Sequence, residues 1–461
     1  MTYLLPCFAI LAVLAVSCPQ VLAERVMKQL HVFTRHGSRL PLAKDALTLE
    51  ESAADKSILT PIGQEQHYQL GTWLRYRYSE VFRSVMMEYD ASKVRIESSD
   101  LERTLTSASS LALGLYPSQF RGESLIPTTP ANIPVYTRQV VHDLNIRSYD
   151  KCPAFHDELE RLYQSPQWET LEKKNMDLLR NLAEIPAFSD YVNVHDISNQ
   201  KYVPLYEIWN VFDMIHVAKT ECQDSTALEP CTQLPDPSLV SVLSDDVWKE
   251  VEQLAHKAEF LRYSPSTAGT KLGGPMWDTI LRRVQALGPD RLYVTSAHYP
   301  TLLGLFAALG LPWGDMDEEE VLPDYASALL LEVYQEGPNP ANLYVKVYYK
   351  PGSAADVMAV RISDNCPTDT DQGCPFAIFA QVVDKARLTP EEWCVACGNT
   401  KADVCMKQQL ERYQEQSCLN NSSGNLAGIY FAGVGTILVL VLLIALIMRY
   451  MRSTEAKRRE N

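Results

Sequence analysis

The residues best suited to chemistry lie near the start of the chain, in Arg35-His36-Gly37-Ser38-Arg39-Leu40-Pro41. The guanidinium groups of Arg35 and Arg39 can each bind phosphate oxygens in pairs, and a neutral imidazole at His36 can attack phosphorus. Gly37 lets the backbone approach a ligand closely. The pattern R-H-G-x-R-x-P would arise by chance on the order of once in ten thousand chains of this length, assuming roughly even residue usage. The spacing therefore predicts a site for phosphate binding and phosphoryl transfer.

Two further segments carry candidate residues for the same site. In Ser98-Ser99-Asp100-Leu101-Glu102-Arg103, the pair Ser99 and Glu102 has the spacing of a capping box at a helix start. Arg103 then lies near a helix N-terminus, where free N–H groups and the helix dipole favour anions. His298 ends another predicted strand, just before Tyr299 and Pro300. Taken singly, such an arginine is usually a solvated charge and such a histidine a core residue, so the prediction depends on all three segments.

The elements that must position these residues alternate between strands and helices. Apolar patterning predicts three strands, each followed by a helix: Lys28–Thr34 before Leu59–Tyr78, Val94–Ser98 before Leu101–Tyr116, and Arg291–Thr295 before a helix from Pro300. Ala328–Gln335 and Leu343–Lys350 flank a Gly-Pro-Asn-Pro turn and predict a hairpin. We therefore predict an α/β fold, with a mainly parallel sheet flanked by helices, an antiparallel edge and a helical cap insert at about 142–270.

The composition limits the classes of protein that are compatible with this chain. With 46% hydrophobic and 21% charged residues among 461, the chain can form a packed core, which excludes disordered and collagen-like classes. The formal net charge of −15 argues against a nucleic-acid binder, because affinity for nucleic acid requires a basic face that displaces phosphate counterions.

Both ends of the chain predict export and membrane attachment. Residues 1–23 have the apolar run and small-residue end of a signal peptide, but no Lys or Arg precedes the run, so a retained N-terminal anchor is the alternative. Residues 426–448 carry no charge and are long enough to span a bilayer. The tail at 449–461 is basic, which favours the cytosol. We predict a single-pass type I membrane protein of the endosome, lysosome or cell surface, with a lumenal or extracellular domain at 24–390 and a Cys-containing stalk at 391–425.

The cysteines agree with an exported protein. Nine of the 11 cysteines remain after removal of the predicted signal peptide, and disulfides form in oxidising compartments. Two short separations predict local disulfides, Cys222–Cys231 and Cys366–Cys374. Cys394 and Cys397 have the spacing of a redox or zinc half-site, but no second ligand pair has matching spacing, so we expect no metal there.

Several segments together resemble the histidine acid phosphatase family, especially the branch with the prostatic and lysosomal acid phosphatases. They are RHGSRLP at 35–41, LTPIGQEQHYQLG at 59–71, SSDLERTLTSA at 98–108, SAHYPTL at 296–302 and YASALLLEVY at 325–334. The resemblance implies an α/β core with a helical cap, as in the phosphoglycerate mutase-like fold. It also implies hydrolysis of phosphomonoesters through a phosphohistidine, with no metal and no other cofactor.

The resemblance assigns roles residue by residue. His36 matches the catalytic nucleophile that becomes a phosphohistidine. Arg35, Arg39 and Arg103 match the arginines that hold the phosphoryl oxygens of the substrate. His298 matches the second catalytic histidine of the phosphate pocket.

The resemblance also concerns cross-links and assembly. The family's bond from the cap to the C-terminal segment implies a disulfide from Cys152 to Cys394 or Cys397. Frequent dimers in the family imply a homodimer as one assembly of this chain. Gly428 and Ala432 in the predicted span have the spacing of a small-residue helix contact, although small residues are common in such helices.

One position departs from the family. The family has His-Asp at the third site, where the aspartic acid protonates the leaving oxygen, whereas this chain has Tyr299 after His298. Without that acid an alkoxide leaves poorly, while an aryl oxide leaves largely unaided. Three explanations stay open: Tyr299 acts as a weak acid, another carboxylate such as Asp324 or a cap residue has the role, or the domain binds a phosphorylated ligand without catalysis.

Our main hypothesis from the sequence is a membrane-anchored acid phosphatase that acts on phosphomonoesters outside the cytosol. The alternative is a catalytically weak or silent receptor or trafficking protein with a phosphatase-like domain. A phosphoryl transferase or mutase is a third hypothesis, but an exported compartment offers few acceptors of a phosphoryl group other than water.

Overall fold

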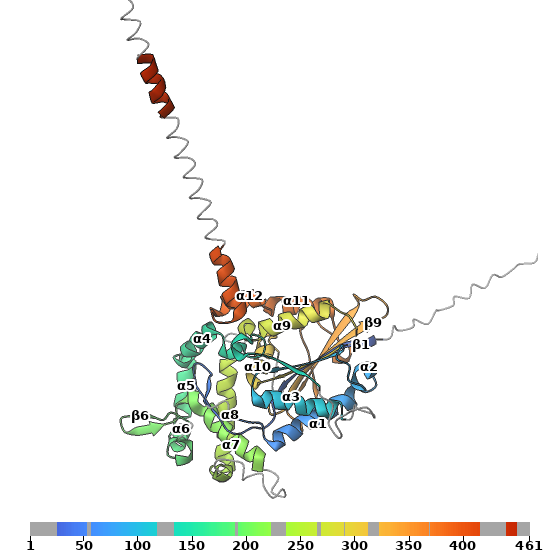
Figure 1. Ribbon diagram of the computed structural model, residues 1–461. Coiled ribbons are helices and arrows are strands. Elements are labelled where there is room, and N and C mark those ends of the chain that lie inside the picture. The colour runs from blue at the N-terminus through green and yellow to red at the C-terminus, as the bar shows by residue number, and fades with distance from the viewer. Residues whose placement is uncertain are drawn as a thin grey trace, which may run out of the picture.

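The computed structural model describes most of the chain between the two predicted terminal segments (Figure 1). The described residues are 25–52, 57–117, 133–189, 192–222, 237–264, 269–289, 291–311, 322–367, 369–414 and 439–449. The predicted signal peptide at 1–23 lies outside them. Of the predicted span at 426–448, only residues 439–448 are described, and they are helical. No helix within the described ranges is both long and apolar enough to cross a membrane.

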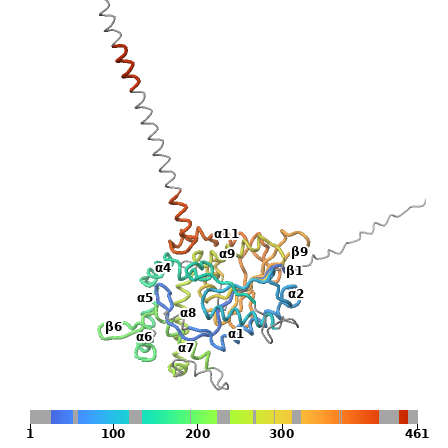
Figure 2. Tube along the Cα trace, viewed as in Figure 1, coloured from blue at the N-terminus to red at the C-terminus, as the bar shows by residue number. Residues whose placement is uncertain are grey.

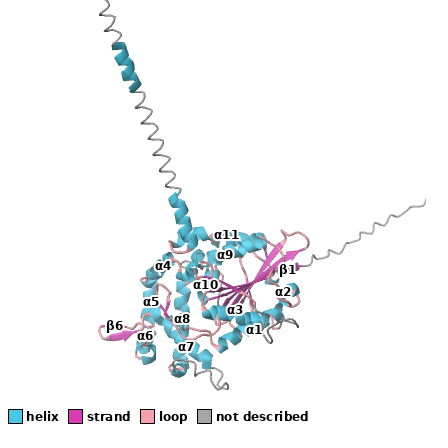
Figure 3. Cartoon of the chain, in the orientation of Figure 1, coloured by secondary structure: helices cyan, strands magenta, loops and turns pink. Residues whose placement is uncertain are grey.

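An eight-stranded sheet forms the centre of the molecule, and Figure 3 shows helices around it. Its order is β11-β10-β9-β1-β8-β4-β5, with β12 paired to β10. The strands are β1 (Arg25–Arg35), β4 (Val94–Ser99), β5 (Val135–Arg138), β8 (Arg291–Ala297), β9 (Ala328–Glu336), β10 (Leu343–Lys350), β11 (Met358–Val360) and β12 (Cys374–Pro375). Strands β1, β8, β4 and β5 pair in parallel, whereas β9, β10 and β11 form an antiparallel edge. The predicted mixed α/β fold is confirmed.

The register of the parallel strands brings the candidate residues to one edge of the sheet. Arg35 of β1 pairs with Ala297 of β8. Ser98 of β4 pairs with Ser296, one residue earlier in β8. Since the carboxyl ends of these three strands lie side by side, the loops that follow them meet at the same edge, where open α/β sheets bind their ligands.

Helices cover both faces of the sheet, so residues of β1 and β9 are buried on both faces. Leu30 and Val32 of β1 belong to the apolar cluster that includes residues of α1 and α3. Phe33 belongs to the apolar cluster on the opposite face of the sheet. Figure 1 shows α1 and α3 side by side on one side of the sheet, with α9 and α11 on the other. The covering helices are α1 (Pro61–Tyr78), α2 (Arg83–Met86), α3 (Glu102–Leu115), α9 (Gly269–Gln285), α10 (Tyr299–Leu309) and α11 (Phe376–Ala386).

The chain between β5 and α9 forms a mostly helical part beside the sheet, at the left of Figure 2. Its helices are α4 (Pro153–Tyr163), α5 (Pro166–Lys174), α6 (Met176–Ala183), α7 (Ile208–Cys222) and α8 (Asp245–Arg262). It also contains a hairpin that the sequence did not reveal, β6 (His195–Ile197) with β7 (Gln200–Tyr202). Its strands are short and mostly exposed, so they lack the apolar alternation by which a strand is recognised.

Disulfides tie the helical part to the C-terminal segment. Cys152, just before α4, is bonded to Cys397 at the end of α12 (Pro390–Cys397), which is one of the two pairings implied by the family. The predicted Cys366–Cys374 bond is confirmed. Cys394 is bonded to Cys405, so neither cysteine of the C-x-x-C segment is available to a metal. Cys222 is disulfide-bonded, and its predicted partner Cys231 lies outside the described residues.

Candidate active site

Two histidines and three arginines meet where β1, β4 and β8 end. The predicted residues Arg35, His36, Arg39, Arg103 and His298 are all at least 96% buried, with exposed fractions of 1–4%. The imidazole rings of His36 and His298 lie edge to face with centroids 5.5 Å apart. Burial first, and then the positive charges of Arg103 and Arg35, hold the pKa of His36 well below its usual range. The structure therefore brings all five residues into one buried, cationic cluster with a neutral imidazole in it.

The orientation of His36 determines which ring nitrogen carries the proton. Its Nδ1 lies 2.8 Å from the carbonyl oxygen of Gly37. Because a carbonyl only accepts hydrogen bonds, Nδ1 carries the proton and Nε2 carries the lone pair. The loop is held against α1: a Cβ on Gly37 would lie 2.2 Å from the backbone oxygen of Gly63, so only glycine fits. Thr60 caps α1 by accepting from the Gly63 N–H at 3.1 Å.

His298 is held by residues from two other elements. Its Nε2 lies 2.8 Å from Ser99 Oγ and 3.4 Å from Arg147 Nη1. The capping box predicted for Ser99 and Glu102 is wrong, because α3 has Leu101 at its N-cap without a side-chain bond. Ser99 faces His298 instead, and Glu102 accepts from the backbone N–H of Leu59 at 2.9 Å. The sequence carried no local sign of Arg147, which resembles any solvated arginine in a helical segment.

Two acidic residues pair with the arginines, and neither was singled out in the sequence. Asp213 of α7 accepts two hydrogen bonds from Arg39, from Nη1 at 2.8 Å and from Nη2 at 2.7 Å. Glu51 accepts from Arg103 Nη2 with both carboxylate oxygens, at 2.7 and 2.6 Å. Glu51 belongs to a short hairpin, β2 (Ala43–Lys44) with β3 (Glu51–Ser52). Both pairs join segments far apart in the sequence, so spacing alone could not find them.

Several guanidinium nitrogens in the cluster have no partner. Among the described residues, the buried unpartnered side-chain nitrogens include Arg35 Nε, Arg39 Nε and both Nε and Nη1 of Arg103. A buried N–H without an acceptor is unfavourable by about 1–3 kcal/mol, and more for a charged group. Unpartnered donors on three neighbouring cations match the needs of a tetrahedral oxyanion, whose oxygens accept several hydrogen bonds each.

Tyr299 stands at the position of the missing acid and belongs to a separate buried network. Its hydroxyl donates to Glu259 Oε2 at 2.7 Å and accepts from Lys44 Nζ at 2.5 Å. Glu259 is also paired with Arg262. Burial first, and then the charge of Glu259, raise the pKa of Tyr299 well above its usual range. The phenol proton is thus committed to Glu259, and the group is a weaker acid than an ordinary tyrosine.

Asp324, the alternative acid suggested by the sequence, is also engaged. Its Oδ1 accepts from His216 Nε2 at 2.9 Å and from the backbone N–H of Tyr325 at 2.7 Å. Partial burial would raise the pKa of Asp324, whose side chain is 51% exposed, but the hydrogen bond and charge of His216 dominate and lower it to about 2. The ring of Tyr325 packs 4.1 Å from the Arg35 guanidinium, and the charge of Arg35 also lowers the pKa of Asp324.

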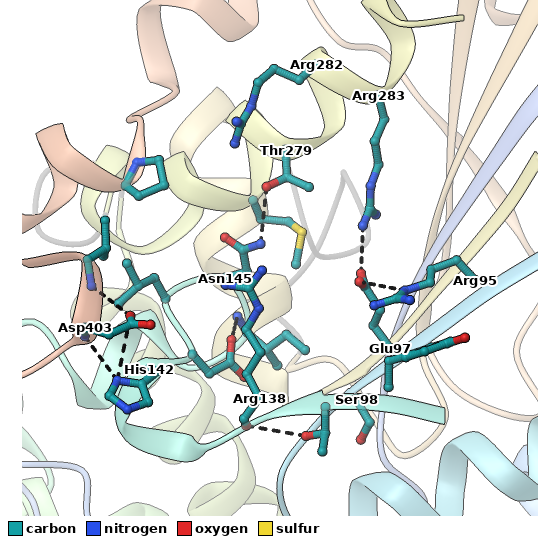
Figure 4. Close-up of a pocket in the computed structure, with 18 of the residues that line it drawn as sticks. Arg95, Glu97, Ser98, Arg138, His142, Asn145, Thr279, Arg282, Arg283 and Asp403 are labelled. Atoms are coloured by element: carbon teal, nitrogen blue, oxygen red, sulfur yellow. Dashed lines mark hydrogen bonds and ion pairs between the residues drawn. The ribbon is translucent and has the colours of Figure 1, made fainter. Parts of the chain in front are cut away.

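A second cleft of about 620 Å³ lies between β4, β5, α9 and the segment after α12. Figure 4 shows Arg283 of α9 reaching Glu97 of β4, and His142 beside Asp403. None of the clustered histidines and arginines lines this cleft. Arg95 and Arg283 both pair with Glu97, and the cleft is a separate feature from the histidine and arginine cluster. No group of side chains suited to a metal ion occurs among the described residues.

Comparisons with known proteins agree on one family. Residues 51–350 match the model of the histidine phosphatase superfamily, branch 2. The chain is 30% identical over 406 residues to the testicular acid phosphatase of Homo sapiens, covering 84% of this chain and 85% of that protein. It is 26% identical to the human lysosomal acid phosphatase, covering 81% and 80%. A Hafnia alvei phytase in complex with tartrate has a TM-score of 0.56 at 15% identity, over 79% of this chain and 98% of that one, which shows a shared fold.

Proposed function

Because the chain belongs to branch 2 of the histidine phosphatase superfamily and is a phosphatase, we propose that it hydrolyses phosphomonoesters through a covalent phosphohistidine at His36. The lone pair of His36 Nε2 forms the N–P bond while the P–O bond to the leaving group breaks. Water then attacks phosphorus, phosphate leaves, and the electron pair of the N–P bond returns to Nε2. The arginines Arg35, Arg39 and Arg103 hold the phosphoryl oxygens in both steps.

One observation carries this proposal: buried, unpartnered guanidinium nitrogens surround an imidazole whose free nitrogen is unprotonated. Buried donors that are fixed in place before the reaction can stabilise the developing charge without reorganising during it. Neutral His36 is the nucleophilic form, and its low pKa preserves that form in acid solution. The neighbouring His298 is neutral for the same reasons, since burial and the charge of Arg103 lower its pKa as well.

Labelling of the intermediate tests the nucleophile. A labelled phosphate donor should give an alkali-stable protein label that is absent from His36→Ala, because phosphohistidine survives base and requires the imidazole. His195 lies exposed in β6, and His195→Ala provides the matched control that keeps the label. Label that persists in His36→Ala would place the covalent step on another residue.

The second candidate function is a phosphate-binding domain without turnover. The observation in its favour is the hydrogen bonding of Tyr299, whose proton is directed to Glu259 rather than to a leaving group. Hydrolysis of an aryl phosphate at acid pH distinguishes the two, because an aryl oxide departs without a proton donor. Binding of inorganic phosphate with no turnover of the aryl ester would favour the binding protein.

We also propose that the protein is a type I membrane protein that functions as a homodimer. The apolar residues at 1–23 and 426–448 and the basic tail support the topology. The lysosomal and prostatic relatives fit a lysosomal or secreted location. Resistance of the full chain to alkaline extraction from membranes, and a dimer mass in mild detergent, are the expected results.

A further inference from the structure

Glu51 is a carboxylate that reaches the arginine cluster from outside the strand ends. The hairpin β2–β3 that carries it lies between the loop of His36 and the start of α1 in sequence. Its side chain is 12% exposed, so it is largely withdrawn from water but not sealed. The charged or titratable groups that face it are Arg103 of α3, Arg147, Arg39, Lys44 and Tyr149. Glu51 thus lies among the cations that would bind the substrate phosphate.

The contact with Arg103 differs from the contact between Asp213 and Arg39. Each carboxylate oxygen of Asp213 accepts a hydrogen bond from a different guanidinium nitrogen of Arg39. The Asp213 side chain is 1% exposed, so this is a buried bidentate ion pair. Both oxygens of Glu51 share the single nitrogen Nη2 of Arg103, and Nε and Nη1 of that arginine have no partner among the residues that the structure describes. Each Glu51 oxygen therefore keeps lone-pair capacity, and a phosphate held by the other two nitrogens would lie beside this carboxyl group.

Building on the proposed function, we propose that Glu51 is the proton donor to the leaving oxygen, the role for which Tyr299 is unsuited. As His36 Nε2 forms the N–P bond, the P–O bond breaks and its electron pair takes the proton of the Glu51 carboxyl group. In the second step the Glu51 carboxylate accepts a proton from the water that attacks phosphorus, and the N–P electron pair returns to Nε2. Glu51 then returns this proton to the departing phosphate, so that alcohol and dihydrogen phosphate are the products and the free protein again carries a carboxylate.

The substrate brings the proton that this step needs. Burial would raise the pKa of Glu51, but the charges of Arg103 and Arg147 lower it to about 2, so the free protein carries an ionised carboxylate at working pH. A phosphomonoester has a second pKa of about 6 and binds below that pH as a monoanion with one proton. When the bound phosphomonoester and the Glu51 carboxylate lie at the same arginine, the repulsion between their negative charges favours sharing the substrate's proton between them. Turnover should therefore fall as pH rises above about 6, where the substrate arrives as a dianion.

The dependence on leaving group tests this role in the full chain. Glu51→Gln should lower kcat for glycerol phosphate by about 10²-fold or more, while kcat for an aryl phosphate falls far less. Inhibition by inorganic phosphate at pH 7 should become stronger in Glu51→Gln, because the amide removes a negative charge from the binding site. Equal losses for both esters together with weaker phosphate inhibition would make Glu51 a positioning residue only and would overturn the proposal.

Asp213→Asn provides the matched comparison, since it removes the charge of the other acid paired with a cluster arginine. It should lower the turnover of both esters to the same extent and weaken phosphate inhibition, because it only loosens Arg39. An unchanged thermal transition of Glu51→Gln shows that the variant is folded. If wild type does not turn over the aryl ester, the proposed function fails and the donor role fails with it. If wild type is active and Glu51→Gln keeps full activity on glycerol phosphate, only the donor role fails.

Discussion

At the scale of the residue, the chemistry of this site depends on which protons are already committed to partners. Tyr299, Lys44 and Glu259 form a continuous buried chain, and burial lowers the pKa of Lys44 to about 8 in spite of the charge of Glu259. The phenol bridges a cation and an anion that are 3.5 Å apart. Replacing an aspartic acid by tyrosine at this position is compatible with the fold because both of the hydroxyl's partners are present.

Tyr299→Phe separates a structural hydroxyl from a catalytic one. We expect the ratio of alkyl to aryl phosphate turnover to stay the same, because Glu51 and not Tyr299 donates the proton to the leaving oxygen. The free energy of unfolding should fall by about 1–3 kcal/mol, since Lys44 and Glu259 lose a buried partner. Urea unfolding and turnover of the two esters are the measurements.

Tyr263→Phe is the control for this prediction. Tyr263 is also buried and its ring lies 6.2 Å from that of Tyr299, yet its hydroxyl has no hydrogen-bond partner among the described residues. Its loss should therefore leave stability unchanged or raise it. A selective loss of alkyl phosphate turnover in Tyr299→Phe, absent from Tyr263→Phe, would make the phenol the working acid.

The residues that the sequence identified were those that local spacing makes conspicuous. His36 and Arg39 stand in one short motif, and Arg103 and His298 follow predicted strands. Glu51 could not be identified, because its partner is 52 residues away and glutamate in a polar segment is usually solvated. Identifying such a contact requires knowing that the β2–β3 hairpin folds against the first turn of α3, which local spacing does not encode.

At the scale of the element, α1 links the active-site loop to the stability of the fold in acid. His67 of α1 is fully buried, and its Nε2 lies 3.0 Å from the carbonyl oxygen of Arg35. Burial lowers the pKa of His67 to about 4 although that hydrogen bond opposes the shift. The folded protein therefore binds fewer protons here than the unfolded chain between pH 6.5 and about 4.

His67→Gln should flatten the dependence of stability on acid. In wild type, the contribution of neutral His67 is complete above pH 6.5 and is lost as pH falls towards about 4, a loss of about 3 kcal/mol. Glutamine can still donate to the Arg35 carbonyl but does not titrate. Urea unfolding at several pH values measures the slope. His195→Gln in the exposed β6 is the control and should keep the wild-type slope of unfolding free energy against pH. A wild-type slope in His67→Gln would contradict the prediction and would mean that α1 opens before the molecule unfolds.

The long elements were predictable from sequence and the short ones were not. α1 and β10 end where the patterning predicts, because a helix stripe and an alternating strand both record the face that they bury. The hairpins β2–β3 and β6–β7 have strands of two or three residues, too short for a period to be recognised. The first of these carries Glu51, so the missed element and the missed site residue have one cause.

At the scale of the whole molecule, the helical part must stay docked on the sheet for the site to be complete. Arg147 and Asp213 both come from the chain between β5 and α9, and they contact His298 and Arg39. Ser148 Oγ also donates to the Leu272 carbonyl of α9 at 2.6 Å. The Cys152–Cys397 disulfide closes a separation of 245 residues around this arrangement, whereas Cys366–Cys374 closes one of 8.

Removal of the two disulfides should therefore have unequal effects. If a cross-link acts mainly by restricting the unfolded chain, the longer loop contributes about 5.5 kcal/mol and the shorter one about 2.5 kcal/mol. The double variant Cys152→Ala, Cys397→Ala should thus lose more free energy of unfolding in urea than Cys366→Ala, Cys374→Ala. It should also lose aryl phosphate turnover at a lower urea concentration than it loses the sheet's circular dichroism signal, because Arg147 lies five residues before Cys152 and moves with it. Equal destabilisation by the two pairs, with activity and dichroism lost together, would mean that the apolar contacts between α9 and the helical part hold the site without the cross-link.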